Sequence, residues 1–232
     1  MVRNVCDCSF SIAIISHPRL FLQGGGILCL LVVCPSLSRQ LCCAIMKKTL
    51  AFGTSGEERF FMRKVLVVID MQNDFIDGAL GTGEVQAMLP RLVAKLERET
   101  DAVLVFTQDT HGVDYLETQE GKNLPVPHCI KPEKGWEIAP VLKPFVEKAA
   151  AVVEKPTFGS LELPKVIAGL EPDAIELVGL CTDICVIANA MILKVAFPEV
   201  PVSVDASCCA GVTPESHENA LQAMKMCQVA IH

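Results

Sequence analysis

The sequence predicts a single α/β domain, a three-layer α-β-α fold built on a six-stranded, mostly parallel sheet. From Lys64 onward, apolar runs of strand length alternate with amphipathic runs of helix length. This order is typical of a parallel sheet covered by helices on both faces. The chain of 232 residues is long enough for one such domain and an appendage, but too short for a second large domain.

The first half of the domain is predicted as strand, helix, strand and a long loop. Val65–Asp70 and Ala102–Thr107 are apolar runs of strand length, and Val85–Glu99 is predicted as a helix. The helix is indicated by apolar residues at helical spacing, namely Leu89, Leu92, Val93 and Leu96. Gln108–Gly135 has no clear periodicity and is longer than a connector needs to be, so we expect it to hold part of a site.

The alternation resumes in the second half and supplies the remaining strands. Predicted helices lie near Glu137–Ala149, Leu163–Ala168, Ile184–Val195 and Pro214–Met226. Predicted strands are Ala151–Glu154, Ala174–Leu180, Val202–Asp205 and Gln228–Ile231. With the two earlier strands, these complete a sheet of six.

Residues 1–61 differ in character from the remainder and are predicted to be an N-terminal extension. Leu20–Cys34 is apolar but interrupted by three glycines, too short for a comfortable bilayer span and without the layout of a signal peptide. A weak signal peptide or anchor is the alternative. Met62 directly precedes the first convincing strand, so we expect residues 1–61 to be disordered or translated upstream sequence and residues 62–232 to be the domain.

Composition excludes some partners and indicates a compartment. The net charge of −7 and pI near 5.3, with scattered positive residues, offer no basic surface for nucleic acid, and we expect no membrane association. Of twelve cysteines, six fall within the first 43 residues and the others are dispersed through the strand and helix pattern. A domain of this size needs no disulfides, which favours reduced thiols and a cytoplasmic protein.

Four reactive side chains each follow a different predicted strand: Asp70, Asp109, Lys155 and Cys185. The carboxyl ends of parallel strands line one crevice, where ligands bind. Taken singly, Asp70 is better explained as a turn cap and Lys155 as a solvated surface lysine. Together they provide a thiol nucleophile, a carboxylate base and a cation. Cys185 also lies one residue into a predicted helix, so we expect it to ionise more readily than a free cysteine.

The long loop contains a second set of chemically active residues, Asp109, His111, Glu120 and His128. Two imidazoles with carboxylates suit Zn²⁺, Mn²⁺ or Fe²⁺. An isolated histidine is ordinarily a surface residue, but two of the five histidines of the chain fall in this loop. We therefore expect one divalent transition metal, with Zn²⁺ the first choice.

Three motifs in order resemble the cysteine hydrolases of the isochorismatase-like superfamily, and most of all the nicotinamidases. They are Val68–Phe75 (VIDMQNDF), Val153–Pro156 (VEKP) and Val178–Cys185 (VGLCTDIC). The likeness spans residues 64–232 and implies the isochorismatase-like fold. It further implies that Asp70, Lys155 and Cys185 form a catalytic triad.

The resemblance also implies roles for other residues. The Leu180–Cys181 peptide corresponds to the cis bond of the family, which turns the Cys181 amide inward so that the Cys181 and Cys185 N–H groups form an oxyanion hole. Asp109, His111 and His128 match the metal ligands of nicotinamidases, and Glu120 matches if one residue is inserted. The aromatic residue that precedes the Pro-His of characterised relatives is replaced by Leu124–Val126. Substrate-binding aromatics are therefore sought in Phe75, Phe158 and Trp136.

Together these observations predict a metal-dependent amidohydrolase that converts nicotinamide to nicotinate and ammonia through a cysteine thioester. The resemblance implies an enzyme of pyridine nucleotide salvage, with a small-molecule amide as its partner and a homo-oligomeric state. One alternative is a metal-independent hydrolase of the family, acting on a carbamoyl, ureido or isochorismate-type substrate. A non-catalytic binding protein on this fold is another, although such a protein would be expected to lose a triad residue.

Overall fold

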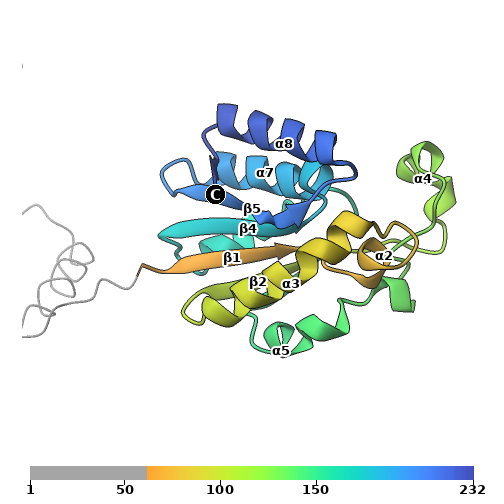
Figure 1. The fold of residues 1–232 in the computed structure, drawn as a ribbon, viewed down its shortest axis with the longest axis horizontal. Coiled ribbons are helices and arrows are strands. Elements are labelled where there is room, and N and C mark those ends of the chain that lie inside the picture. Colours follow the sequence, from red (N-terminus) through yellow and green to blue (C-terminus); the bar gives the residue numbers. More distant parts are fainter. Residues whose placement is uncertain (1–61) are drawn as a thin grey trace, which may run out of the picture. The chain divides into compact units, whose positions relative to one another are not determined.

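The computed structural model describes residues 62–232, which form a six-stranded sheet between two layers of helices (Figure 1). All six strands are parallel, in the order β3-β2-β1-β4-β5-β6. The strands are β1 Lys64–Ile69, β2 Val103–Asp109, β3 Ala151–Lys155, β4 Ala174–Leu180, β5 Val202–Ala210 and β6 Ala230–Ile231. The predicted fold class is confirmed.

The central strands form because their side chains are apolar on both faces. Every residue of β1 after Lys64 is fully buried, and β4 is buried from Ile175 onward. Continuous apolar runs of this kind are typical of parallel strands that are covered on both faces. Gly179 in β4 has φ of +115°, and a Cβ there would lie 2.2 Å from the Ile69 carbonyl oxygen, so this position requires glycine.

The helices divide into two layers. One face of the sheet is covered by α3 (Gly83–Arg98), together with α2 (Asn73–Ile76) and α5 (Lys143–Val146). The opposite face packs against α6 (Leu163–Ala168), α7 (Ile187–Ala196) and α8 (Pro214–Met226). A further short helix, α4 (Gln119–Asn123), lies in the long loop after β2. The layers leave the carboxyl edge of the sheet free for a site.

Several predicted boundaries need correction. The continuous helix expected near 137–149 is wrong: a 3₁₀ turn, Pro140–Leu142, and the four-residue α5 occupy this segment. Pro144 lacks an N–H group and its ring obstructs the carbonyl of Pro140, so an uninterrupted helix cannot form. β5 continues five residues beyond the predicted end at Asp205, and the closing strand is shorter than expected.

The helix predicted from Ile184 has a different beginning. A π-helical turn, Thr182–Val186, precedes α7 and contains Cys185. In the part of the chain that the structure describes, no helix is long and apolar enough to cross a bilayer. The six cysteines there are all free thiols. The prediction for residues 1–61 lies outside the described residues.

Candidate active site

The structure brings the four strand-end residues together at the carboxyl edge of the sheet. Asp70 follows β1, Asp109 ends β2, Lys155 ends β3 and Cys185 lies in the turn after β4. All four side chains are at least nine-tenths buried. Strand order places β2, β1 and β4 side by side, so residues from distant parts of the chain share one crevice.

Backbone conformation and two polar neighbours fix the orientation of Asp70. Its φ of +49° lies in the left-handed region, where aspartate is enriched over most residues. The hydroxyl of Thr107 donates to Asp70 Oδ1 over 2.6 Å and accepts the Asp70 N–H over 3.2 Å. Gln72, fully buried, joins the ends of β1 and β2 because its amide both donates to the Asp109 carbonyl and accepts the Asp109 N–H.

Lys155 is the centre of the charged cluster. Its Nζ lies 2.7 Å from Asp70 Oδ2, 3.0 Å from Asp109 Oδ1 and 3.5 Å from Cys185 Sγ. Burial acts to lower the pKa of this ammonium group, but the charges of Asp70, Cys185 and Asp109 outweigh burial, and the net pKa is raised. Lys155 therefore stays protonated and holds the carboxylates and the thiol around one cation.

The protonation state of the thiol differs from the sequence-based expectation. Burial raises the pKa of Cys185 well above its usual value, and the negative charge of Asp70 adds to the effect, against the opposing charge of Lys155. The expectation that Cys185 ionises more readily than a free cysteine is wrong for the free protein. The thiol is buried in a π-helical turn beside the carboxylate of Asp70. Burial and this negative charge raise the pKa of the thiol by more than the helix amides lower it.

A raised pKa at Asp70 gives the thiol a suitable proton acceptor. Burial is the main cause of the increase, which the cation of Lys155 only partly offsets. A general base works best when its pKa approaches the operating pH, because it is then both ionised and basic enough. The raised pKa of Asp70 therefore makes its carboxylate chemically able to accept a proton from the neighbouring Cys185 thiol.

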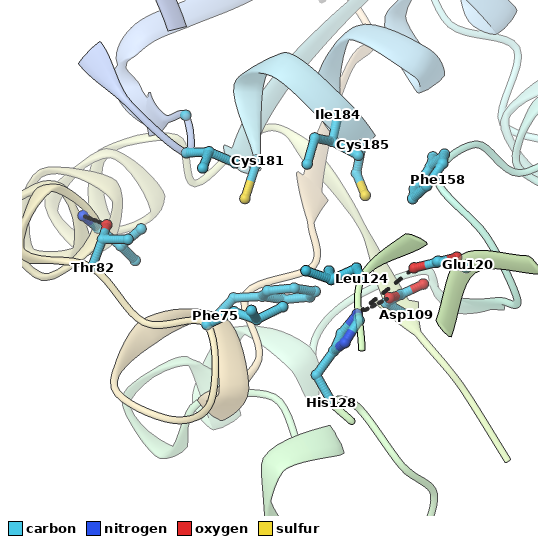
Figure 2. Close-up of a pocket in the computed structure, with 14 residues that line it drawn as sticks. Phe75, Thr82, Asp109, Glu120, Leu124, His128, Phe158, Cys181, Ile184 and Cys185 are labelled. Carbon is cyan, nitrogen blue, oxygen red and sulfur yellow. Dashed lines mark hydrogen bonds and ion pairs between the residues drawn. The ribbon is translucent and has the colours of Figure 1, made fainter. Parts of the chain in front are cut away.

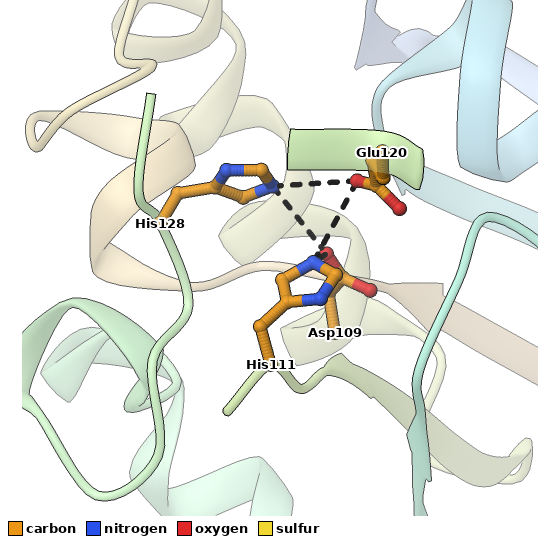
Figure 3. Close-up of side chains that lie close together, drawn as sticks. All are labelled: Asp109, His111, Glu120 and His128. Atoms are coloured by element: carbon orange, nitrogen blue, oxygen red, sulfur yellow. Dashed lines mark hydrogen bonds and ion pairs between the residues drawn. The ribbon is translucent and has the colours of Figure 1, made fainter. Parts of the chain in front are cut away.

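The second predicted set also forms a cluster, beside the first (Figure 3). One ligand atom each from Asp109, His111, Glu120 and His128 lie within 4.8 Å of one another. His111 Nε2 is 3.0 Å from Asp109 Oδ2, and His128 Nε2 is 3.7 Å from the same oxygen. The two histidines lie 3.7 and 3.8 Å from Glu120 Oε1.

The loop folds back on itself to assemble this cluster. His111 forms a parallel bridge with Ile130, in which its N–H donates to the Cys129 carbonyl. The carboxylate of Asp74, on α2, accepts the Cys129 N–H over 2.7 Å and holds the segment that carries His128. The segment expected to hold a site, Gln108–Gly135, thus provides all four side chains in the cluster, of which Asp109 lies at the end of β2 and the other three lie beyond it.

The donor atoms fit a divalent transition metal. Four ligands about 2.1 Å from a tetrahedral ion lie about 3.4 Å apart. The histidine–carboxylate distances of 3.0 to 3.8 Å are close to that spacing, and all four ligand atoms lie within 4.8 Å of one another. The Nδ1 atom of His128 is 2.8 Å from the Val126 carbonyl oxygen, which accepts its proton and leaves Nε2 as the free donor atom toward the cluster. The set therefore has the chemistry and the tautomer that a metal site requires.

Both clusters open into one cavity of about 220 Å³ (Figure 2). Cys181 and Cys185 direct their sulfur atoms toward it from one side, and Phe75 and Leu124 face them. Phe158 lines it near Glu120 and is 45% exposed, so it lies at the entrance. These residues form a mainly apolar pocket with a few polar groups, as small-molecule sites usually do.

Of the three aromatic residues considered for substrate binding, Trp136 lies elsewhere. Its indole N–H donates to Thr110 Oγ1 over 2.9 Å, and Lys131 Nζ lies 4.9 Å from its ring centre. The Trp136 carbonyl accepts from the Gln72 amide, so this residue supports the site without lining the cavity. Phe75 and Phe158 are in the cavity wall, as expected.

Sequence reasoning missed three buried polar residues that hold the site together, namely Gln72, Thr107 and Asn189. Gln72 was part of a recognised motif, and Thr107 lies two residues before Asp109 on the same strand face. Asn189 lies four residues after Cys185, one helical turn away, and donates to the Cys185 carbonyl over 2.8 Å. The position of each residue relative to the site residues can be read from the sequence. A single polar residue within an apolar run does not, however, show which group it will bond to.

The cis Leu180–Cys181 peptide expected from the resemblance is present.

Comparison with known proteins agrees with this geometry. The chain is 29% identical over 143 residues to the isochorismatase family protein PncA of Bacillus subtilis (strain 168), a match that covers 56% of this chain and 78% of that protein. Two solved structures share the fold at 26% identity and cover 73% of this chain. One is the pyrazinamidase of Pyrococcus horikoshii in complex with zinc, with a TM-score of 0.63 and 98% of that chain covered. The other is nicotinamidase PncA of Bacillus subtilis, with a TM-score of 0.64 and 99% of that chain covered.

The family profile of the isochorismatase domain matches residues 64–232, which is most of the chain and the whole sheet described above. The match includes every residue of the two clusters. This protein therefore belongs to the isochorismatase family of hydrolases.

Proposed function

We propose that the protein is a metal-dependent amidohydrolase that converts nicotinamide to nicotinate and ammonia. The observation that carries the proposal is the shared cavity: Cys185 and three of the four candidate metal ligands, Asp109, Glu120 and His128, line the same space. A reactive thiol and a site for a pyridine nitrogen are thus available to one small molecule. The likeness to structures named as a nicotinamidase and as a pyrazinamidase in complex with zinc supports this substrate class.

The chemistry begins with proton transfer from Cys185 to Asp70, while Lys155 keeps the buried charges balanced. The thiolate attacks the amide carbon, and the backbone N–H groups of Cys181 and Cys185 stabilise the oxyanion that forms. Asp70 returns the proton to the amide nitrogen, and the carbon–nitrogen bond breaks. Ammonia departs, and the acyl group remains on Cys185 as a thioester.

Hydrolysis of the thioester completes the cycle. Asp70, again a carboxylate, accepts a proton from water as the water attacks the thioester carbonyl, and it returns this proton to the Cys185 sulfur when the carbon–sulfur bond breaks. The nicotinic acid that forms loses its own proton to solvent and leaves as nicotinate. Asp109, His111, Glu120 and His128 would hold a divalent ion close to the ring-binding part of the cavity. When bound, that ion supplies a Lewis acid that a pyridine nitrogen can ligate.

Ammonia release tests the proposal. The purified protein is assayed with nicotinamide, pyrazinamide and a carbamoyl amide, each before and after chelation and after metal is restored. Cys185→Ala is the control for the nucleophile. The expected result is rapid release from the two ring carboxamides, lost on chelation and recovered with metal. Faster turnover of the carbamoyl amide that is insensitive to chelation would instead favour a metal-independent hydrolase of the family.

A further inference from the structure

The cavity has a second end, opposite the metal cluster, that the proposed reaction does not use. Its wall there is formed by five residues that we call the apolar lobe: Leu80, Thr82, Val85, Gly211 and Val212. Figure 2 places Thr82 on one side of Cys181 and the Asp109–Glu120 pair on the other side of Cys185. The nucleophile therefore lies between a polar end and an apolar end.

Strand order independently separates the two ends. Asp109 ends β2, whereas Gly211 directly follows β5, and β1 and β4 lie between these strands. Three spacings between neighbouring strands amount to about 14 Å. This separation between the backbones exceeds the length of one aromatic ring with its carboxamide, which is consistent with a lobe that a nicotinamide held at the polar end does not fill.

The lobe is suited to hydrocarbon. Leu80, Val85 and Val212 present only aliphatic side chains. Val85 is 2% exposed and forms the inner wall, whereas Val212 is 52% exposed and forms the outer edge. The hydroxyl of Thr82 already accepts the Val85 N–H over 3.3 Å, where it caps α3. The Val212 N–H, in turn, is directed to the carboxylate of Asp183. Apart from the Thr82 hydroxyl, whose own proton is not used in its bond with the Val85 N–H, and the backbone groups, the lobe offers hydrocarbon, against which a polar ligand atom would be left unpaired.

We propose that the apolar lobe is a substrate subsite, and that the preferred substrate is an aromatic carboxamide with an apolar substituent on the ring edge remote from the ring nitrogen. The proposal rests on the proposed function, because the carboxamide must reach Cys185. With the ring nitrogen at the polar end, positions 4 and 5 of the ring face away from Asp109 and His128. Position 6 is adjacent to the nitrogen and faces the polar end.

Isomeric ligands test this arrangement without any change to the lobe. Cys185→Ala protein, isolated with its metal, is titrated by calorimetry with nicotinamide and with its 5-ethyl and 6-ethyl derivatives. N-ethylnicotinamide, an isomer that carries the same carbons on the amide nitrogen, is the further control. Each methylene buried in the lobe is expected to tighten binding about fourfold, so 5-ethylnicotinamide should bind about fifteenfold more tightly than nicotinamide.

A matched pair of variants places the effect in the lobe. Val212→Phe, in the Cys185→Ala background, fills the space and is expected to reduce the fifteenfold preference to less than threefold. Val195→Phe makes the same replacement at an exposed position on α7, outside the cavity, and should retain the preference. Circular dichroism of both variants verifies folding.

The outcomes separate the subsite from the proposed function. If nicotinamide binds and is hydrolysed by the unmodified protein but the 5-ethyl derivative binds no better than the 6-ethyl or N-ethyl isomer, the subsite is refuted and the proposed function stands. If none of these amides binds or is hydrolysed, both are refuted. Preference for the 5-ethyl isomer, lost only in Val212→Phe, supports the subsite.

Discussion

Asn189 connects the nucleophile to the wall of the cavity, and its removal should affect both stability and substrate binding. The side chain is fully buried on α7. Its Nδ2 donates to the carbonyls of Cys185, over 2.8 Å, and Phe158, over 3.0 Å. Its Oδ1 accepts the Ser160 N–H over 3.0 Å. One amide thus joins the π-helical turn of the thiol to the loop that carries Phe158.

The replacement Asn189→Ala removes three hydrogen bonds and leaves their backbone partners buried. At about 1 kcal/mol for each bond, the free energy of unfolding should fall by about 3 kcal/mol. If half of that energy positions the loop with Phe158, KM for nicotinamide should increase about tenfold. The fall in kcat should be smaller, because the charged groups of the site remain in place.

Urea unfolding and steady-state ammonia release measure these two effects. Asn219→Ala, on an exposed position of α8, is the matched control and should change neither quantity. An Asn189→Ala protein with a stability within 0.5 kcal/mol of the unmodified chain would refute the stability reasoning, since 0.5 kcal/mol is about the lower limit for a single hydrogen bond. An unchanged KM would refute the link to Phe158.

Other predictions concern the nucleophile, the metal and the charges of the core. Cys185→Ala should abolish ammonia release without altering circular dichroism, and activity within a few-fold of the unmodified protein would exclude Cys185 as the nucleophile. His128→Ala should lose most of the metal found by elemental analysis, and retention of one ion per chain would contradict the ligand assignment. Lys95→Met removes a cation that lies 2.9 Å from the buried carboxylate of Glu176 and from the partly exposed carboxylate of Asp205. Because Lys64 still lies 2.9 Å from Glu176, the change should cost about 2 kcal/mol at pH 7. Burial acts to raise the pKa of Asp205, but the hydrogen bond from Lys95 outweighs burial, and the net pKa is lowered. The Lys95–Asp205 pair therefore stabilises the fold at neutral pH, and this stabilisation is lost as the pH falls below the usual aspartate range. The deficit of Lys95→Met in urea unfolding should therefore shrink between pH 7 and pH 3, and a constant deficit would contradict this sign.

Much of the fold could be predicted because the central strands are apolar on both faces. Val65–Ile69 and Ile175–Leu180 are continuous apolar runs in which the only exception is Glu176, and such runs are visible in the sequence. The helix expected near 137–149 does not form as one element because Pro144 interrupts the backbone hydrogen bonds that a continuous helix would need. The end of β5 is not evident from the sequence because its residues beyond Asp205 are small, namely alanine, serine and cysteine.

The site was predictable to the extent that residue type and strand position determine it. The ends of β1 to β4 identified Asp70, Asp109, Lys155 and the turn of Cys185, since parallel strands share one edge. The proton affinity of the thiol was not predictable, because it depends on burial and on the distances to neighbouring charges. Burial and distance also decide which aromatic side chains line the cavity.

The apolar lobe could not have been recognised from the sequence. Val212 lies in a loop and Val85 in the first turn of a helix, 127 residues earlier, so no local pattern links them. Only the strand order, which places β5 beyond β4, brings the loop after β5 to the same crevice. Contacts of this kind depend on tertiary packing.

The covalent intermediate on Cys185 is the central claim, and rapid-quench mass spectrometry tests it most directly. The protein is mixed with nicotinamide, quenched in acid during the first turnover and digested, and ammonia is measured in parallel. A nicotinoyl group is expected on the sulfur of Cys185, at a level that increases during the first turnover and decreases as the substrate is used up. Ammonia release with no acyl group on Cys185, or with the group on Cys181, would contradict the account.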